Sequence, residues 1–173
     1  MAIGYHVPEA KHKDFYALTI LSSILTSGKS SRLYASLVDK KQLATMVFTD
    51  YSASFNPTLF YFYVAANKNV DELDLEKALF EELEKIKKEG ITEKELQKIK
   101  NQKLMEFYNQ VETIDGKSNN IGTYELFFGD YKKMFNAPEN FNKVTLEDIQ
   151  NVAKKYFKKS NRTVGVLKTN VEE

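Results

Sequence analysis

The distribution of apolar residues along the chain predicts four short strands. Residues 3–7 form a first apolar and aromatic run, and the proline that follows ends it because proline lacks an N–H for strand pairing. Residues 44–55 and 58–66 are rich in β-branched and aromatic side chains, and an Asn-Pro pair between them predicts an antiparallel hairpin. The run RTVGVLKT at 162–169 predicts a closing strand.

Apolar residues elsewhere recur at three- and four-residue spacing, which predicts helices with one buried face. Thr92 and Glu95 form a capping box, in which Glu95 reaches back to the Thr92 N–H. Gly28 and Gly90 mark two helix ends, because glycine readily adopts the left-handed backbone found there. The predicted helix starts are Asp14, Ser30 or Ser31, Asp71, Thr92 and Thr145.

The order of these elements predicts a single α+β domain over residues 1–173. We expect two layers, with a mostly antiparallel sheet and helices packed on one of its faces. A break is predicted at residues 115–118, where Asp, Gly, Lys and Ser follow one another. One or two short helices should come after it and pack through Tyr124, Phe127, Phe128 and Phe135.

Both faces of the predicted strand at 58–66 are apolar. Leu59, Tyr61 and Tyr63 share one side, and Phe60 and Phe62 share the other. This pattern predicts a strand that is covered on both sides or that flanks a partner. We take Phe60 and Phe62 as a candidate partner surface.

The composition narrows the classes of function. The 173 residues are 42% hydrophobic, which suits one globular domain, and 25 basic against 24 acidic residues give no general electrostatic reason to expect nucleic acid. The absence of cysteine excludes disulfides and thiolate chemistry. No apolar run approaches the ~18 residues of a membrane helix. Met1 and Ala2 lead directly into a predicted strand, which indicates a piece of a longer polypeptide.

The segment from His6 to Ala10 is one residue short of the zinc-protease motif H-x-x-E-H, because Ala10 stands where the second histidine would be. The motif also needs a helix, whereas Pro8 favours an extended backbone. The other histidine is His12, and with no cysteine the chain lacks an obvious set of three ligands. We therefore predict that this chain binds no metal.

Other local signatures are incomplete. Residues 27–30 end like a phosphate-binding loop, but Ser23 replaces its first glycine and a helix precedes it where the motif has a strand. The lysines at 154, 155, 158 and 159 are best explained as the solvated side of an amphipathic helix. The sequence contains no serine-nucleophile elbow. Local chemistry thus offers no complete active site.

Several motifs nevertheless occur together in a recognisable order. Their positions are Gly4, Tyr5, His6, Pro8, Asp14, Gly28, Ser30, Ser31, Arg32, Leu33, Tyr34 and the stretch 92–96. In these positions the chain resembles the C-terminal-type, non-catalytic domain of the pitrilysin/insulinase zinc metallopeptidases, which include mitochondrial processing peptidase. The resemblance implies the metalloprotease-like fold shared by LuxS and the processing peptidases.

The resemblance implies a domain without catalytic residues or bound metal of its own. Such peptidases pair homologous domains around a peptide, and one domain carries H-x-x-E-H. Zinc is then expected in the full-length enzyme, held by a catalytic domain in the same polypeptide or in a partner subunit. This chain would complete the chamber around a peptide substrate, with Phe60 and Phe62 as candidate chamber surface. No membrane span and no nucleic acid are expected.

Two positions depart from the family pattern. Many companion domains supply an arginine and a tyrosine that hold the substrate, but Val38 and Thr45 stand in their places here. This departure favours a domain that follows the zinc domain in the same polypeptide. We expect Arg32 to act as a capping or interdomain ion-pair residue and Tyr34 to pack. The alternative function is a stand-alone scaffold that binds a peptide or partner without hydrolysis.

Overall fold

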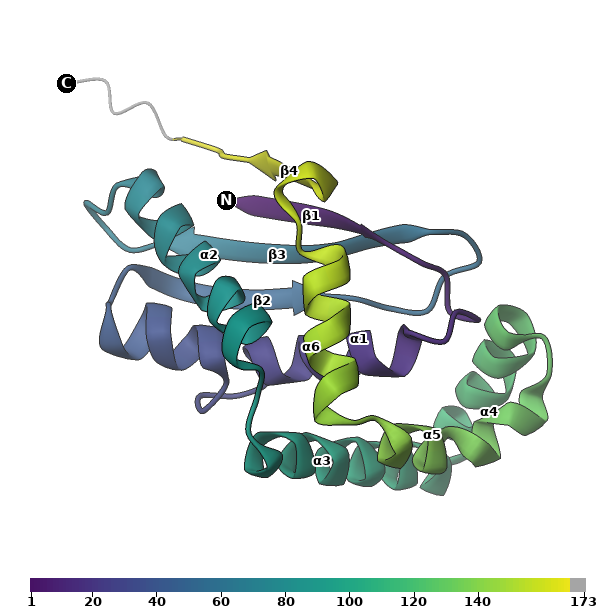
Figure 1. The fold of residues 1–173 in the computed structure, drawn as a ribbon. Helices are drawn as coiled ribbons and strands as arrows, with labels where there is room; N and C mark the ends of the chain where they lie inside the picture. Colours follow the sequence, from purple (N-terminus) through teal and green to yellow (C-terminus); the bar gives the residue numbers. More distant parts are fainter. Residues whose placement is uncertain (169–173) are drawn as a thin grey trace.

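The computed structural model describes residues 1–168, and Figure 1 shows its elements in chain order. Thr169, the last residue of the predicted closing strand, lies outside this range. The strands are β1 (Ala2–Val7), β2 (Ala44–Asp50), β3 (Thr58–Ala66) and β4 (Arg162–Gly165). The α-helices are α1 (Phe15–Thr26), α2 (Glu72–Glu89), α3 (Glu93–Glu112), α4 (Ile114–Thr123), α5 (Ala137–Lys143) and α6 (Leu146–Tyr156). Shorter π- or 3₁₀-helices are η1 (Tyr34–Lys40), η2 (Tyr124–Phe128), η3 (Tyr131–Asn136) and η4 (Lys159–Asn161).

The strands form one antiparallel sheet in the order β2-β3-β1-β4, so the first strand lies inside the sheet and the last strand forms an edge (Figure 1). Tyr5 pairs with Phe60 on β3 and with Arg162 on β4. Because side chains alternate along a strand, Tyr5 and Phe60 share one face, while Gly4 and its partner Tyr61 share the other. The predicted α+β class and antiparallel sheet are confirmed.

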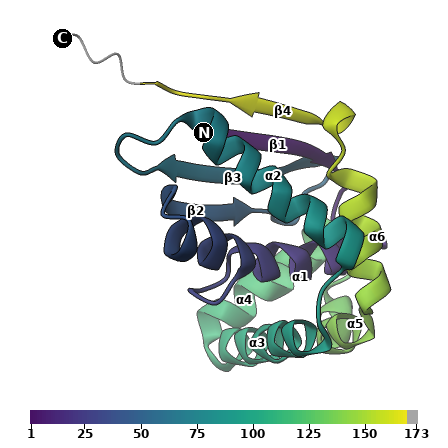
Figure 2. The same ribbon diagram turned by 60° about the vertical axis from the view of Figure 1, so that its left-hand side comes forward.

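Helices cover one face of this sheet and bury its aromatic residues. α2 and α6 lie over the face, and α1 runs along β2 (Figures 1 and 2). Phe157, directly after α6, packs against Phe60 and Phe62 with ring centroids 5.1 and 5.5 Å apart. Phe60 and Phe62 are both 0% exposed, so the prediction that they form a partner or chamber surface is wrong. The strand register turns them into the core.

The predicted caps explain where several helices begin and end. Thr92 donates its N–H to the Glu95 carboxylate at 2.8 Å and accepts the Glu95 N–H at 3.2 Å, which confirms the capping box. Asp71 accepts the Leu73 N–H at 2.8 Å at the start of α2. Gly90 ends α2 at φ +73°, a backbone that glycine adopts without steric cost.

The second predicted helix is largely a π-helix, η1, which the sequence pattern does not distinguish from an α-helix. Its wider turn is closed by the Lys41 N–H, which donates to the Ser36 carbonyl five residues earlier at 2.9 Å. The expected cap at its start is wrong for Ser31, whose hydroxyl donates instead to the Gly28 carbonyl at 2.7 Å.

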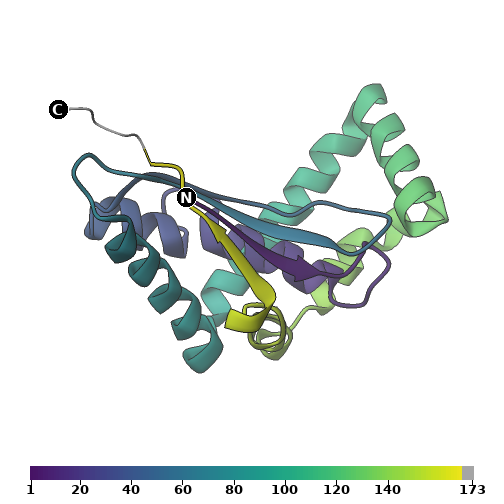
Figure 3. The ribbon, with the colours of Figure 1, turned by 90° about the horizontal axis from the view of Figure 1, so that it is seen from above.

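α3 and α4 form a helical hairpin, and the break between them lies at Thr113 rather than at 115–118. The Thr113 hydroxyl accepts the Gly116 N–H at 3.1 Å and so caps α4. A Cβ on Gly116 would lie 2.1 Å from the Gln110 carbonyl oxygen, so the tight junction requires glycine. Seen from above, α4 projects on the side of the sheet opposite α2 and α6 (Figure 3).

A second, smaller cluster anchors this hairpin. Tyr124 and Phe128 are buried, with ring centroids 4.6 Å apart, and Phe128 contacts Phe15 of α1. Their predicted packing is confirmed, and Phe127 is partly buried against the same cluster. Phe135 is 66% exposed, so its predicted packing is wrong: the 3₁₀-helix η3 buries Met134 instead. No helix within residues 1–168 is long and apolar enough to cross a membrane.

Candidate functional site

The motif that begins with Gly4 and Tyr5 lies on β1, and its residues pack within the sheet. Gly4 lies on the face without covering helices, where a Cβ would come within 3.5 Å of the Tyr61 ring. Tyr5 is 1% exposed and packs against Phe157 at 4.9 Å between ring centroids. The strand ends at Val7, directly before Pro8, as predicted. These residues therefore position β1 within the sheet.

The two histidines lie in different local surroundings. The His6 side chain is exposed, and its backbone carbonyl accepts from the Asn161 amide at 3.0 Å. His12 uses its Nδ1 atom to accept the Asp14 N–H at 3.1 Å. Among residues 1–168 no three His, Cys, Asp or Glu side chains are grouped so that they could hold a metal ion.

Asp14 ties the start of α1 to the end of α6. Its carboxylate accepts from the Lys155 ammonium and from the Tyr156 hydroxyl, both at 2.7 Å. Burial raises the pKa of Asp14, but the bonds from Lys155 and Tyr156 outweigh burial and hold this pKa below its ordinary value. The ionised carboxylate therefore acts as a fixed crosslink between two helices.

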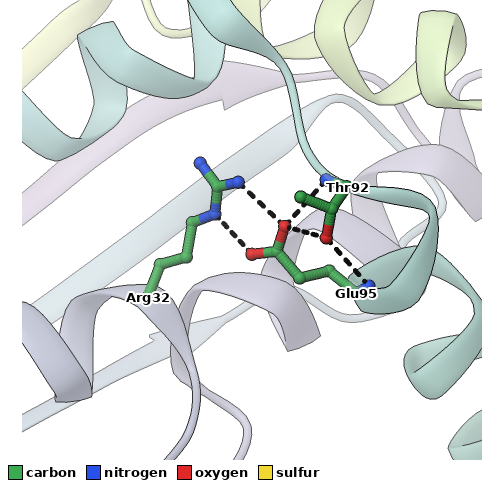
Figure 4. A network of polar contacts seen from close by, with 3 residues as sticks. All are labelled: Arg32, Thr92 and Glu95. Atoms are coloured by element: carbon green, nitrogen blue, oxygen red, sulfur yellow. Dashed lines mark hydrogen bonds and ion pairs between the residues drawn. The ribbon is translucent and has the colours of Figure 1, made fainter.

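Arg32, from the motif at residues 28–34, forms a bidentate ion pair with Glu95, shown in Figure 4. Its guanidinium donates to both Glu95 oxygens, with Nε–Oε1 at 2.6 Å and Nη2–Oε2 at 2.9 Å. The same carboxylate accepts from Thr92, so one side chain closes a capping box and a bidentate ion pair. Arg32 and then Thr92 lower the pKa of Glu95 to about 2. Arg32 thus pairs within the domain and does not cap its own helix, which corrects our expectation.

The turn between α1 and η1 is held along α3. Gly28 adopts φ +79°, and Ser27 accepts from the Gln102 amide at 2.8 Å. The Lys98 ammonium donates to the Ser30 hydroxyl. Leu33 is fully buried and Tyr34 is partly buried against the core, as expected for packing residues. The phosphate-loop-like segment is therefore a helix-to-helix turn.

The structure places Val38 and Thr45, the two positions that depart from the family pattern, in different surroundings. Val38 is partly buried against the core. Thr45 is exposed at the start of β2, and its hydroxyl donates to the Ala65 carbonyl at 3.3 Å. Neither side chain carries a positive charge or an acidic hydroxyl that would polarise a carbonyl.

The sheet face turned away from α2 and α6 is the best candidate for a functional surface. Met46 is 50% exposed, Phe48 is 41% exposed, and Tyr61 and Tyr63 are partly exposed beside them. Phe48 and Tyr63 stack with centroids 4.8 Å apart, and Tyr63 stacks on Tyr61 at 5.6 Å. A hollow of ≈ 540 Å³ at one end of this face is lined by Met1, Ala2, Met46, Phe48, Tyr63 and Leu167, among others.

Phe60 and Phe62 lie on the buried face of β3. The exposed face carries Met46 and Phe48 of β2, which pair with Ala65 and Tyr63 across the hairpin and alternate along their strand. We call the set Met46, Phe48, Tyr61 and Tyr63 the bare sheet face.

Comparison with known proteins identifies the family. The model of the peptidase M16 inactive domain matches residues 1–103. The chain therefore belongs to the peptidase M16 inactive domain family, which confirms the resemblance inferred from the motifs.

Two relatives are named as zinc proteases. The zinc protease PqqE of Helicobacter pylori is 36% identical over 168 residues, covering 97% of this chain and 38% of that protein. YmxG of Bacillus subtilis, described as an uncharacterised zinc protease, is 27% identical over 157 residues, covering 91% of this chain and 38% of that protein. The chain thus spans about two fifths of the length of these relatives.

Solved structures share the fold. A crystal structure of a protease from Helicobacter pylori gives a TM-score of 0.87 at 35% identity, covering 93% of this chain and 39% of that chain. A structure described as an inactive peptidase domain from Bordetella parapertussis gives a TM-score of 0.87 at 25% identity, covering 99% of this chain and 93% of that chain.

Proposed function

We propose that this chain is the non-catalytic domain of a zinc-dependent endopeptidase and that its bare sheet face packs against the catalytic part of the enzyme. The observation that carries the proposal is the exposure of Met46 and Phe48 beside Tyr63, on a face that α2 and α6 leave free. Exposed apolar patches of this kind mark interaction surfaces, since covering them removes apolar area from water.

The length of the relatives supports a partner within the same polypeptide. The region that matches this chain covers 38% of PqqE and 38% of YmxG. The rest of each relative is long enough to contain a second domain. We infer that the additional part carries H-x-x-E-H and the zinc ion. A partner subunit that supplies the zinc domain is the second arrangement compatible with this surface.

The substrate would be an unfolded peptide held between the two domains. Val38 and Thr45 leave this domain without an arginine or tyrosine to polarise the scissile carbonyl, so that role falls to groups outside the chain. This domain would then contribute to the shape of the peptide chamber and to the area buried against the catalytic domain.

Reconstitution tests the proposal. The chain and the remaining part of the full-length protein are produced separately, and cleavage of an unfolded peptide is measured for each part and for their mixture. We expect cleavage by the mixture that a chelator abolishes, and none by the chain alone. A full-length protein that binds peptides, lacks bound zinc and does not cleave them would instead support the scaffold function.

The variant Phe48→Glu tests whether the bare sheet face is the docking surface. A buried, unpaired carboxylate at the interface should weaken activation of the mixture at least tenfold. Leu73→Glu is the matched control, because Leu73 is 67% exposed on α2, over the opposite face. Equal activation by both variants would refute docking through the bare sheet face.

A further inference from the structure

The α3–α4 hairpin and η2, which directly follows it, carry further exposed apolar side chains. Ile114 is 88% exposed, Leu126 is 60% exposed, and Ile121 is 39% exposed. Ile114 and Ile121 are seven residues apart and so lie on one side of α4. Phe55, from the loop between β2 and β3, is 60% exposed and contacts Phe127 of η2 at 4.6 Å between ring centroids. We call Phe55, Ile114, Ile121 and Leu126 the hairpin surface.

The hairpin is a fixed part of the domain. Thr113 caps α4, and Gly116 packs tightly against the Gln110 carbonyl at the junction. Tyr124 and Phe128 anchor η2 in the second cluster, and Phe128 contacts Phe15 of α1 at 5.3 Å between ring centroids. The exposed residues are therefore presented from a rigid support, as in preformed interfaces.

The hairpin projects on the same side of the sheet as the bare sheet face. α2 and α6 lie on the other side, as the view from above shows (Figure 3). A folded domain seated on the bare sheet face would therefore lie beside the projecting hairpin.

We propose that the hairpin surface is the second half of the contact with the catalytic domain, so that this domain seats both on the sheet and against the α3–α4 hairpin. The inference rests on the proposed function, and the occupant is the additional polypeptide that makes up the rest of the relatives' length.

The test measures the affinity of this chain for the separately produced remainder of the full-length protein, by calorimetry. Leu126→Glu should weaken binding at least tenfold, and Leu73→Glu should leave it unchanged. Leu126 is exposed in the chain alone, so the variant should keep the same thermal unfolding midpoint. Hydrogen exchange gives a second readout: residues 114–128 should exchange more slowly in the complex than in the isolated chain.

The outcomes separate this inference from the proposed function. Weakening by Phe48→Glu but not by Leu126→Glu would overturn the hairpin contact and leave the docking of the sheet intact. If neither variant weakens binding, docking through the bare sheet face fails as well. Unchanged binding with a raised KM for peptide would assign the hairpin surface to substrate. Loss of a self-associated dimer in Leu126→Glu, seen by sedimentation, would assign it to a second copy.

Discussion

At the residue scale, the Glu95 carboxylate takes part in two interactions at once, a helix cap and an ion pair. It closes the N-terminal capping box of α3 and pairs with Arg32, which stands at the start of the segment leading into η1. A helix start and a contact distant in sequence therefore depend on one ionised group. The capping box could be predicted from local sequence, but the ion pair could not, because Arg32 and Glu95 are 63 residues apart.

We predict that Arg32→Met lowers the free energy of unfolding by about 1.5–3 kcal/mol at pH 7, the usual range for losing hydrogen bonds to a charged group. The pKa of Glu95 is about 2 in the folded chain and 4.5 ordinarily, so ionised Glu95 stabilises the fold above pH 4.5. This stabilisation is lost as the pH falls toward 2. The difference between wild type and Arg32→Met should therefore shrink over that interval in chemical denaturation.

The control for this prediction is Lys143→Met, which removes an exposed pair with Glu139 on α5. Exposed pairs of this type contribute little, so its stability should stay close to wild type from pH 7 to pH 2. A constant gap between wild type and Arg32→Met across this range would contradict the assigned role of Glu95.

At the scale of elements, residues with a local signal could be predicted and residues set by packing could not. Thr92 and Asp71 mark helix starts by side-chain chemistry that acts within three residues, and both predictions are confirmed. The π-helix η1 has no such local signal. Its Ser36 hydroxyl donates to Glu82 on α2, 46 residues away, and a contact at that separation cannot be predicted from neighbouring residues. The face that Phe60 and Phe62 occupy was likewise set by strand register and helix placement, which the apolar pattern of one strand does not specify.

The α3–α4 junction gives a prediction at this scale. Gly116→Ala should lower the free energy of unfolding by about 2 kcal/mol or more, because the new Cβ would overlap the Gln110 carbonyl and the backbone has to move. Thermal unfolding of the variant measures the loss, and faster hydrogen exchange at 114–128 should accompany it.

Gly122→Ala is the matched control within the same helix. A Cβ there meets nothing within 4 Å, and alanine favours helix over glycine, so stability should rise by about 0.5–1 kcal/mol. Similar effects for the two alanine variants would mean that the junction is not as tight as described.

At the scale of the whole molecule, the sequence predicts the fold class and the family, while the position of the proposed docking surface needs the structure. Ordered motifs such as Gly4-Tyr5-His6 and Arg32-Leu33-Tyr34 are local and readable from the chain. The bare sheet face is assembled from β2 and β3 only after folding. Met46 and Phe48 are exposed because α2 and α6 lie over the opposite face, which the sequence alone does not indicate.

The purified, dialysed chain should contain far less than one zinc per molecule by elemental analysis. The reason is geometric: the Nδ1 atom of His12 is bonded to the Asp14 N–H, and within residues 1–168 no third ligand joins His6 and His12. The double variant His6→Ala/His12→Ala should give the same content. Stoichiometric zinc in the wild type that disappears in the double variant would mean that a metal site exists here.

The measurement that tests the central claim most directly is photocrosslinking in the full-length protein, with benzoylphenylalanine placed at Tyr63 or, as a control, at Leu73. If the bare sheet face seats the catalytic domain, irradiation should link position 63 to that domain and leave position 73 unlinked, as seen after cutting the connection between the domains. A crosslink from position 73 with none from position 63 would contradict the account.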